Sequence, residues 1–319
     1  MIAFEGVSKY YQGRPAVADL QLTCREGEFT VLVGTSGSGK STTLKMANRL
    51  VECDSGVIRF AGADIRQLDP LQLRRRMGYV IQSTGLFPHW TVARNIATVP
   101  ELLKWPGRQI ARRVDELLEL LGLDPEAFRD RYPHQLSGGQ QQRVGVARAL
   151  AADPQVLLMD EPFGALDPVN RGMLQQEIQR IQRRDGRTIV LVTHDVDEAL
   201  LLADRLVLMD GGRIVQQGSP QTLLMHPQSP LVTDFFGQRE TGLRLLALRQ
   251  VRDCLRRGEW LEGCRQPLLE SDSLKSALSQ FIASGCQALP VVSDDGAPLG
   301  SVRLEDVLNY QGDDDAAAD

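Results

Sequence analysis

The chain has 319 residues, of which 42% are hydrophobic, so it is long enough for one large domain with its own core and a smaller second domain. It contains 36 Lys and Arg against 41 Asp and Glu, which gives a formal net charge of −5 at pH 7. Dedicated nucleic-acid-binding proteins usually carry a basic surface, so this balance argues against nucleic acid as a partner.

The cysteines and the first residues indicate a compartment. The five cysteines are scattered, without a C-x-x-C pair: Cys24, Cys53, Cys254, Cys264 and Cys286. This pattern predicts reduced thiols in a reducing compartment, with a redox switch as the alternative. Met1–Glu5 reaches an acid before an apolar stretch begins, and no apolar run approaches the ~18 residues of a membrane span. We therefore expect a cytoplasmic protein that reaches a membrane only through a partner.

Residues 1–237 alternate between short apolar runs and helical patterns. We expect strands at Phe29–Val33, Gly78–Ile81, Val156–Met159, Ile189–Val192 and Leu206–Met209. Continuous apolar strands separated by helices predict an α/β fold with a parallel sheet covered on both faces. A helix is expected where apolar residues recur at helical spacing, within a helix-rich insertion at about 90–150: Ile110, Val114, Leu117, Leu118 and Leu121.

The pattern changes after residue 237. Leu268–Asn309 predicts helix, strand, turn, strand and helix, with the turn at Asp294-Asp295-Gly296. The expected boundaries are a linker or degenerate half-motif at 238–265, a small α/β domain at 266–311 and an acidic, disordered tail at 312–319.

Gly34–Ser41 reads GTSGSGKS and matches G-x-x-x-x-G-K-[ST]. Small residues at Gly34, Ser36, Gly37 and Gly39 let backbone N–H groups curl around phosphate oxygens at the start of a helix. Lys40 would reach the β- and γ-phosphates, and the Ser41 hydroxyl would bind Mg²⁺. A strand-like run before the loop and a helical run after it favour ATP binding over a flexible Gly/Ser turn.

Acidic residues follow a buried strand in Val156–Pro162, VLLMDEP. Ligands of open α/β sheets lie beyond the carboxyl ends of the strands, where Asp160 and Glu161 are expected. Asp160 would hold the Mg²⁺ shell, and Glu161 would polarise the attacking water. The alternative is an exposed turn with two acids.

Gln82 and His194 each follow a predicted strand. If these strands are neighbours, both side chains can converge on one γ-phosphate. For His194, the alternative is a histidine whose hydrogen bonds are made within the protein at the end of a strand, without a role in ATP binding.

Gln135–Leu150, QLSGGQQQRVGVARAL, contains no acid, histidine or cysteine. Ser137, Gly138, Gly139 and Gln140 lead into a predicted helix, whose N-terminus with glycine clearance suits an anion. Phosphoryl transfer depends on positioning and charge stabilisation, so a donor-rich loop without acids is useful there.

The order GTSGSGKS, Gln82, LSGGQ, LLMDEP, ALD at Ala165–Asp167 and His194 resembles the nucleotide-binding subunit of ABC transporters over about residues 1–235. LSGGQ is highly specific to that superfamily. The resemblance implies a P-loop NTPase domain with a mixed sheet core and a helical subdomain. It also implies a head-to-tail dimer of two copies with two ATP molecules and Mg²⁺ at the interface.

The resemblance also implies roles for individual residues. Those that bind ATP are Tyr11 on adenine, with Tyr10 as the alternative, and Lys40, Ser41 and Thr42 on phosphate and Mg²⁺. Those that serve hydrolysis are Gln82 as the sensor of Mg²⁺ and water, Glu161 as the general base and His194 at the γ-phosphate. Ser137–Gly139 would face the γ-phosphate held by the other subunit, and Asp167 would cross the dimer interface.

Tyr79–Trp105, YVIQSTGLFPHWTVARNIATVPELLKW, resembles ATPases that import quaternary-amine osmoprotectants such as glycine betaine, choline or carnitine. This implies permease subunits, a periplasmic or lipid-anchored solute-binding protein, and a peripheral place on the cytoplasmic face of the inner membrane. The apolar residues can also simply pack the subdomain: Leu86, Phe87, Trp90 and Val92. Another small solute, such as an amino acid or polyamine, is the alternative. A soluble ABC ATPase of DNA repair or translation and a cassette without hydrolysis are disfavoured.

Residues 266–311 resemble a CBS motif, with Leu289–Val292 and the following turn as its signature. Osmoprotectant ATPases often carry such motifs in tandem, and here one is clear. It can pair across the dimer or have lost ligand binding, so a regulatory role and a structural one both stay open. The acidic tail is either an ionic-strength sensor or a solvated end.

Overall fold

The computed structural model describes residues 1–83, 85–164, 166–259 and 266–309. The expectations for Ala165, Cys264, the last residues of the linker, residues 310–311 and the acidic tail lie outside this described part. The chain divides into two compact units, Met1–Leu223 and Leu224–Asp319. Each unit is described by itself.

A six-stranded sheet organises the first unit, in the order β10-β9-β3-β8-β7-β6. Its strands are β3 (Phe29–Gly34), β6 (Met77–Val80), β7 (Val156–Asp160), β8 (Thr188–Val192), β9 (Arg205–Asp210) and β10 (Arg213–Gly218). The pairings from β9 to β6 are parallel, and β10 adds an antiparallel edge. Every residue of β3, β7 and β8 is buried. The five strands predicted from apolar runs are thereby confirmed, with bounds that differ from the predicted ones by at most one residue.

A second, antiparallel sheet has the order β2-β1-β4-β5. It consists of β1 (Ile2–Tyr11), β2 (Arg14–Cys24), β4 (Ser55–Phe60) and β5 (Ala63–Asp64). Phe4, Leu20 and Ile58 from this sheet share one hydrophobic core with Leu32 and Val190 of the parallel sheet. Helix α1 (Lys40–Ala47) adds buried residues to the same core. Helix α1 therefore packs into the core that the two sheets share, through Leu44, Met46 and Ala47.

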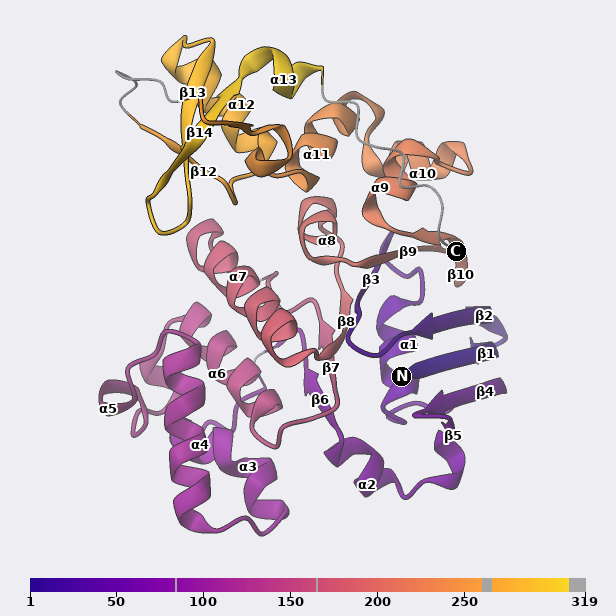
Figure 1. The fold of residues 1–319 in the computed structure, drawn as a ribbon. Coiled ribbons are helices and arrows are strands. Elements are labelled where there is room, and N and C mark those ends of the chain that lie inside the picture. Colours follow the sequence, from indigo (N-terminus) through magenta and orange to yellow (C-terminus); the bar gives the residue numbers. More distant parts are fainter. Residues whose placement is uncertain (84, 165, 260–265, 310–319) are drawn as a thin grey trace. The chain divides into compact units, whose positions relative to one another are not determined.

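The helix-rich insertion between β6 and β7 contains α3 (Val92–Leu102), α4 (Gly107–Leu120), α5 (Pro125–Phe128) and α6 (Gly138–Leu150), which group together in Figure 1. The predicted amphipathic helix is α4, which buries Val114, Leu117 and Leu118. The remaining helices of this unit are α2 (Pro70–Arg75), α7 (Pro168–Asp185) and α8 (Val196–Leu202). Helix α9 (Pro220–Met225) spans the division between the units. In the described part of the chain, no helix is long and apolar enough to cross a membrane.

The second unit contains a four-stranded sheet in the order β11-β14-β13-β12. The strands of this sheet are β11 (Arg256–Arg257), β12 (Leu268–Leu269), β13 (Ala288–Val292) and β14 (Pro298–Arg303). The helices of the unit are α10 (Pro230–Phe236), α11 (Thr241–Leu248), α12 (Leu274–Ser284) and α13 (Leu304–Leu308). The predicted series of helix, strand, turn, strand and helix is confirmed as α12 to α13. Strand β11 comes from the expected linker and pairs with β14, so that segment contributes to the same sheet.

Candidate functional site

The phosphate loop, Gly34–Ser41, connects β3 to α1. The Lys40 ammonium donates hydrogen bonds to the carbonyl oxygens of Gly34 and Thr35 at 2.9 and 2.8 Å and to Ser38 Oγ at 3.1 Å. Burial lowers the pKa of Lys40, an effect opposed by the nearby carboxylates of Glu161 and Asp160. The loop thus surrounds a buried cation at a helix N-terminus, which is an arrangement suited to a phosphate chain.

Two glycines of this loop occupy positions that no other residue fits. Gly34 has a φ of 146°, and a Cβ there would collide with the carbonyl oxygen of Met209 on β9. Gly39 has a φ of 99°, and its Cβ would collide with the carbonyl oxygen of Ala16 on β2. Gly37 also has a positive φ, 80°, but a Cβ there would meet nothing within 4 Å. Close backbone approach therefore explains Gly34 and Gly39, and conformation alone explains Gly37.

The first acidic residue after β7 lies against the phosphate loop. Asp160 is 8% exposed, and its Oδ1 accepts a hydrogen bond from Ser41 Oγ at 2.7 Å. The bond joins the end of β7 to the first turn of α1, where Thr42 is half-buried. Hydroxyl and carboxylate oxygens are the ligands that Mg²⁺ prefers, so this pair fits the predicted metal. Among the residues described, no group of three or more His, Cys, Asp or Glu side chains is placed to hold a metal ion.

Glu161 brings together the residues that leave three neighbouring strands. Its Oε2 accepts a hydrogen bond from Gln82 Nε2 at 2.9 Å, and its Oε1 lies 3.3 Å from His194 Nδ1. Its backbone N–H donates to the Val192 carbonyl oxygen at 2.9 Å, and its φ is 48°. A left-handed conformation is uncommon for glutamate, and such outliers cluster at functional sites. The strands before Gln82 and His194 are not direct neighbours, because β7 lies between them, and both side chains contact Glu161 at the end of β7. Their convergence on a γ-phosphate stays a prediction.

The predicted anion loop and Asp167 form a second group. Ser137 caps α6: its Oγ accepts from Gln140 N–H at 3.3 Å, and Gln140 Oε1 accepts from Ser137 N–H at 3.0 Å. Asp167 caps α7 and accepts from the side chain of Asn170 at 2.6 Å and from its backbone N–H at 3.1 Å. These hydrogen bonds lower the pKa of Asp167.

Asn170 also connects the two caps of this second group. The buried Arg143 of α6 donates through Nη2 to Asn170 Oδ1 at 2.9 Å. A Cβ added to Gly139 would lie 3.4 Å from Asn170 Cγ. Sequence reasoning missed Arg143 and Asn170, although the D-x-x-N spacing of a helix cap was a signal for Asn170.

The predicted adenine-stacking residue lies at the end of β1, where Tyr10 and Tyr11 are 46% and 48% exposed. Asp54 holds this end of the strand: it accepts from Tyr10 N–H at 2.6 Å and from Lys9 Nζ at 2.8 Å. The Lys9 ammonium lies 5.6 Å from the centre of the Tyr11 ring. Exposure does not separate the two tyrosines, so the choice of Tyr11 stays a prediction.

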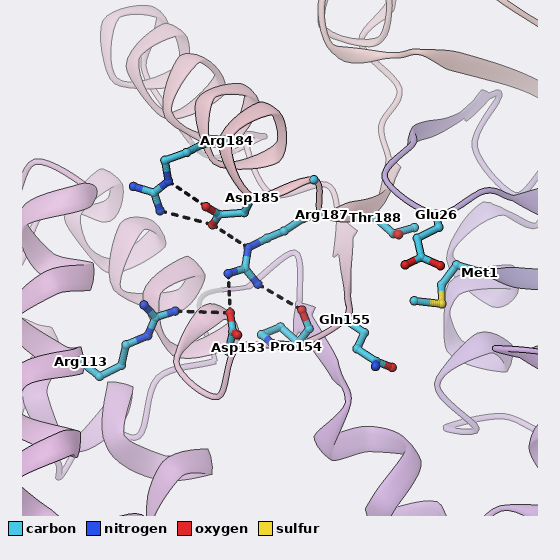
Figure 2. Close-up of a pocket in the computed structure, with 11 residues that line it drawn as sticks. Met1, Glu26, Arg113, Asp153, Pro154, Gln155, Arg184, Asp185, Arg187 and Thr188 are labelled. Atoms are coloured by element: carbon cyan, nitrogen blue, oxygen red, sulfur yellow. Dashed lines mark hydrogen bonds and ion pairs between the residues drawn. The ribbon is translucent and has the colours of Figure 1, made fainter.

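A cleft of about 550 Å³ lies away from these groups (Figure 2). It is bordered by Pro154, Gln155 and Thr188, at the beginnings of β7 and β8, whereas the catalytic candidates follow the ends of these strands. Its arginines are already paired, in the chain Arg184–Asp185–Arg187–Asp153–Arg113. The cleft is therefore not the predicted nucleotide site.

Comparisons with known proteins agree with this geometry. Residues 17–164 match the family model for ABC transporters, and residues 267–313 match the model for CBS domains. The chain is 64% identical over 308 residues to the glycine betaine uptake system ATP-binding protein YehX of Escherichia coli, covering 97% of this chain and 99% of that protein. It is 53% identical over 307 residues to the glycine betaine/carnitine/choline transport ATP-binding protein OpuCA of Bacillus subtilis, covering 96% of this chain and 79% of that protein.

A solved structure shares the fold of the ATPase part. It is the dimer of an ATP-binding cassette in a post-hydrolysis state with ADP and Pi, at 34% identity and a TM-score of 0.63. The match covers 69% of this chain and 99% of that one. The protein is thus a P-loop ATPase of the α/β class. It belongs to the ABC transporter family, as an ATP-binding subunit that carries a CBS domain.

The glycines of the phosphate loop give a graded prediction. Gly37→Ala should cost about 1–2 kcal/mol of stability, because only its left-handed conformation opposes a side chain. Gly34→Ala should cost more and abolish ATP binding, because its Cβ collides with the backbone of β9. Urea denaturation and titration with a fluorescent ATP analogue measure both effects. Equal losses for the two variants would contradict this account.

Proposed function

We propose that the chain is the ATP-hydrolysing subunit of an importer for a quaternary-amine osmoprotectant such as glycine betaine or choline. The observation that supports this most is 64% identity over nearly the whole chain to a glycine betaine uptake ATP-binding protein. An amino acid or a polyamine is the alternative solute. The solute never touches this subunit, so the proposal for the solute depends on the relatives and the proposal for the chemistry depends on the site.

In the proposed mechanism, the residues around the phosphate loop bind the nucleotide. Tyr11 stacks on adenine, and the loop N–H groups, Lys40 and Thr42 hold the phosphates. Ser41, Asp160 and Gln82 supply the oxygen atoms for Mg²⁺, and the amide of Gln82 has its oxygen available because its nitrogen donates to Glu161. Held by these residues, Mg²⁺ would supply positive charge that offsets the charge of the phosphates.

Glu161 accepts the proton of the attacking water in this proposal. Its carboxylate is oriented from both sides, by Gln82 at one oxygen and His194 at the other. His194 is 65% exposed in its side chain, so it can also contact the γ-phosphate. Positioning of the water by a fixed base adds to the charge stabilisation on which phosphoryl transfer also depends.

The second group completes the ATP site of another copy. Ser137, Gly138 and Gly139 present a helix N-terminus without acids, and Gln140 fixes Ser137 through the reciprocal cap. Asp167 lies close to this loop through Asn170, as expected for residues that meet the same partner. The proposed unit of function is a head-to-tail dimer with two ATP molecules.

The permease is proposed to bind at Leu86–Trp90. Phe87 is 43% exposed and lies against Trp90, with ring centres 4.4 Å apart. Buried Asn95 fixes this turn with hydrogen bonds to the backbone of Phe87, Trp90 and Thr91. An ordered aromatic pair with Phe87 exposed and Trp90 half-buried is a suitable contact for a partner helix.

The proposed subunit is peripheral on the cytoplasmic face of the inner membrane, held there through the permease. A periplasmic or lipid-anchored solute-binding protein delivers the solute to the assembled complex. The CBS domain regulates transport or contributes to dimerisation.

Uptake by the assembled transporter tests the solute. We expect transport of at least one quaternary amine from a panel of betaines, cholines, amino acids, polyamines and sugars. Uptake of an amino acid or polyamine alone would replace the solute proposal and leave the ATPase intact.

Glu161→Gln tests the general base. The variant should bind ATP with nearly unchanged affinity, lose at least about 100-fold in kcat, and dimerise more stably with ATP. Phosphate release and size-exclusion chromatography measure these changes. Near-normal turnover would remove Glu161 from the role of base.

Gly138→Asp tests the composite site. A Cβ at Gly138 meets nothing within 4 Å, so the fold accepts a side chain, but a carboxylate there opposes the partner's phosphate. Hydrolysis should fall about 100-fold or more while the monomer still binds ATP, and Gly138→Ala is the uncharged control. Loss of monomer binding would show that the loop contacts the nucleotide of its own subunit.

A further inference from the structure

Helix α7 is joined to α8 and to the residues that flank α8 by a row of polar side chains. Arg171, Gln175, Gln179 and Gln182 recur at helical spacing and lie on one face of α7. They donate, in order, to Asp195 Oδ2 at 3.2 Å, Glu198 Oε1 at 3.0 Å, the Leu201 carbonyl oxygen at 3.2 Å and Asp204 Oδ2 at 3.5 Å. We refer to these four contacts as the α7–α8 seam.

The second contact of the seam is buried. Gln175 and Glu198 are 7% and 5% exposed. Burial raises the pKa of Glu198, while the side chains of Thr193 and Gln175 oppose this through hydrogen bonds. A buried hydrogen bond is directional, and separating these partners leaves the Gln175 amide N–H without its acceptor while Glu198 keeps the bond from Thr193. The seam therefore fixes the register of the two helices more strictly than an apolar contact would.

The first two contacts of the seam lie beside the catalytic candidates. Asp195 follows His194 directly and caps α8 by accepting from Glu198 N–H at 3.0 Å. Arg171 and Glu198 border a cavity of about 40 Å³ that Glu161 and His194 also line. A shift of α7 along α8 would therefore change the surroundings of the proposed base.

The same end of α7 carries the second group of the site. Asp167 caps the helix, and Asn170 accepts from Arg143 of α6 at 2.9 Å. The first two turns of α7 thus carry two kinds of residue. Asp167 is proposed to meet the partner subunit, and Arg171 and Gln175 contact residues beside His194, which is proposed to act on the subunit's own ATP.

We propose that the α7–α8 seam is a positioning element for ATP hydrolysis: Arg171 and Gln175 hold His194 in a fixed place relative to Asp167. The proposal depends on the dimeric ATPase described above. A partner subunit that fixes Asp167 thereby also fixes the histidine beside Glu161. The seam residues act on kcat through His194 and leave ATP binding by the monomer unchanged.

Exchange of the Gln175–Glu198 contact tests the proposal in the full-length protein. Gln175→Glu places two carboxylates together and should lower kcat about tenfold, since small misplacements of catalytic groups are costly, with the ATP Kd within about twofold of wild type. The double variant Gln175→Glu/Glu198→Gln restores a donor opposite an acceptor and should recover kcat to within about threefold. Gln175→Met, which keeps the volume and removes the donor, is the second disrupting variant in case the first folds poorly.

Arg180→Ala is the control on the same helix, because Arg180 is exposed and outside the seam. Unchanged kcat in both disrupting variants would overturn the proposal. So would a double variant that regains thermal stability without regaining kcat, because the contact would then be structural only. Glu161→Gln, measured in parallel, distinguishes failure of the seam proposal from failure of the proposed ATPase mechanism. Near-normal turnover by Glu161→Gln would contradict the mechanism, whatever the seam variants do.

Discussion

The parallel pairing of β3, β8, β7 and β6 is the constraint on which the site depends. Parallel strands end at the same edge, so the phosphate loop, His194, Asp160 and Gln82 meet there although up to 160 residues separate them in the chain. Close approach of Gly34 to β9 and of Gly39 to β2 fixes the loop in that position. Each neighbouring strand then adds a side chain to this edge when a suitable polar residue follows its end.

Much of this arrangement could be predicted from the sequence, because its signals are local. Apolar runs define the buried strands, and the residues that leave those strands include Gln82, Glu161 and His194. The antiparallel sheet of β1, β2, β4 and β5 was not predicted. Its pairings contain register shifts near Val7, Lys9 and Tyr10, which interrupt the simple alternation that indicates a half-buried strand.

Contacts between helices could not be predicted, because they depend on how the elements pack. Gln175 and Glu198 are ordinary polar residues in the sequence, and only the packing of α7 on α8 places them together and buries them. The same holds for Arg143 and Asn170. For Tyr10 and Tyr11, the structure adds nothing to the sequence. The two side chains are similarly exposed, so exposure does not indicate which of them stacks on adenine.

Asn95 has a consequence for the energetics of assembly. Its hydrogen bonds already order the turn from Phe87 to Thr91 in the isolated subunit. Immobilising a loop or a rotamer-rich side chain on binding costs conformational entropy, and this turn has lost most of that freedom beforehand. A partner that engages the Phe87–Trp90 pair then contacts an ordered turn that is continuous with α3. A displacement of this turn would therefore move the helical subdomain with it.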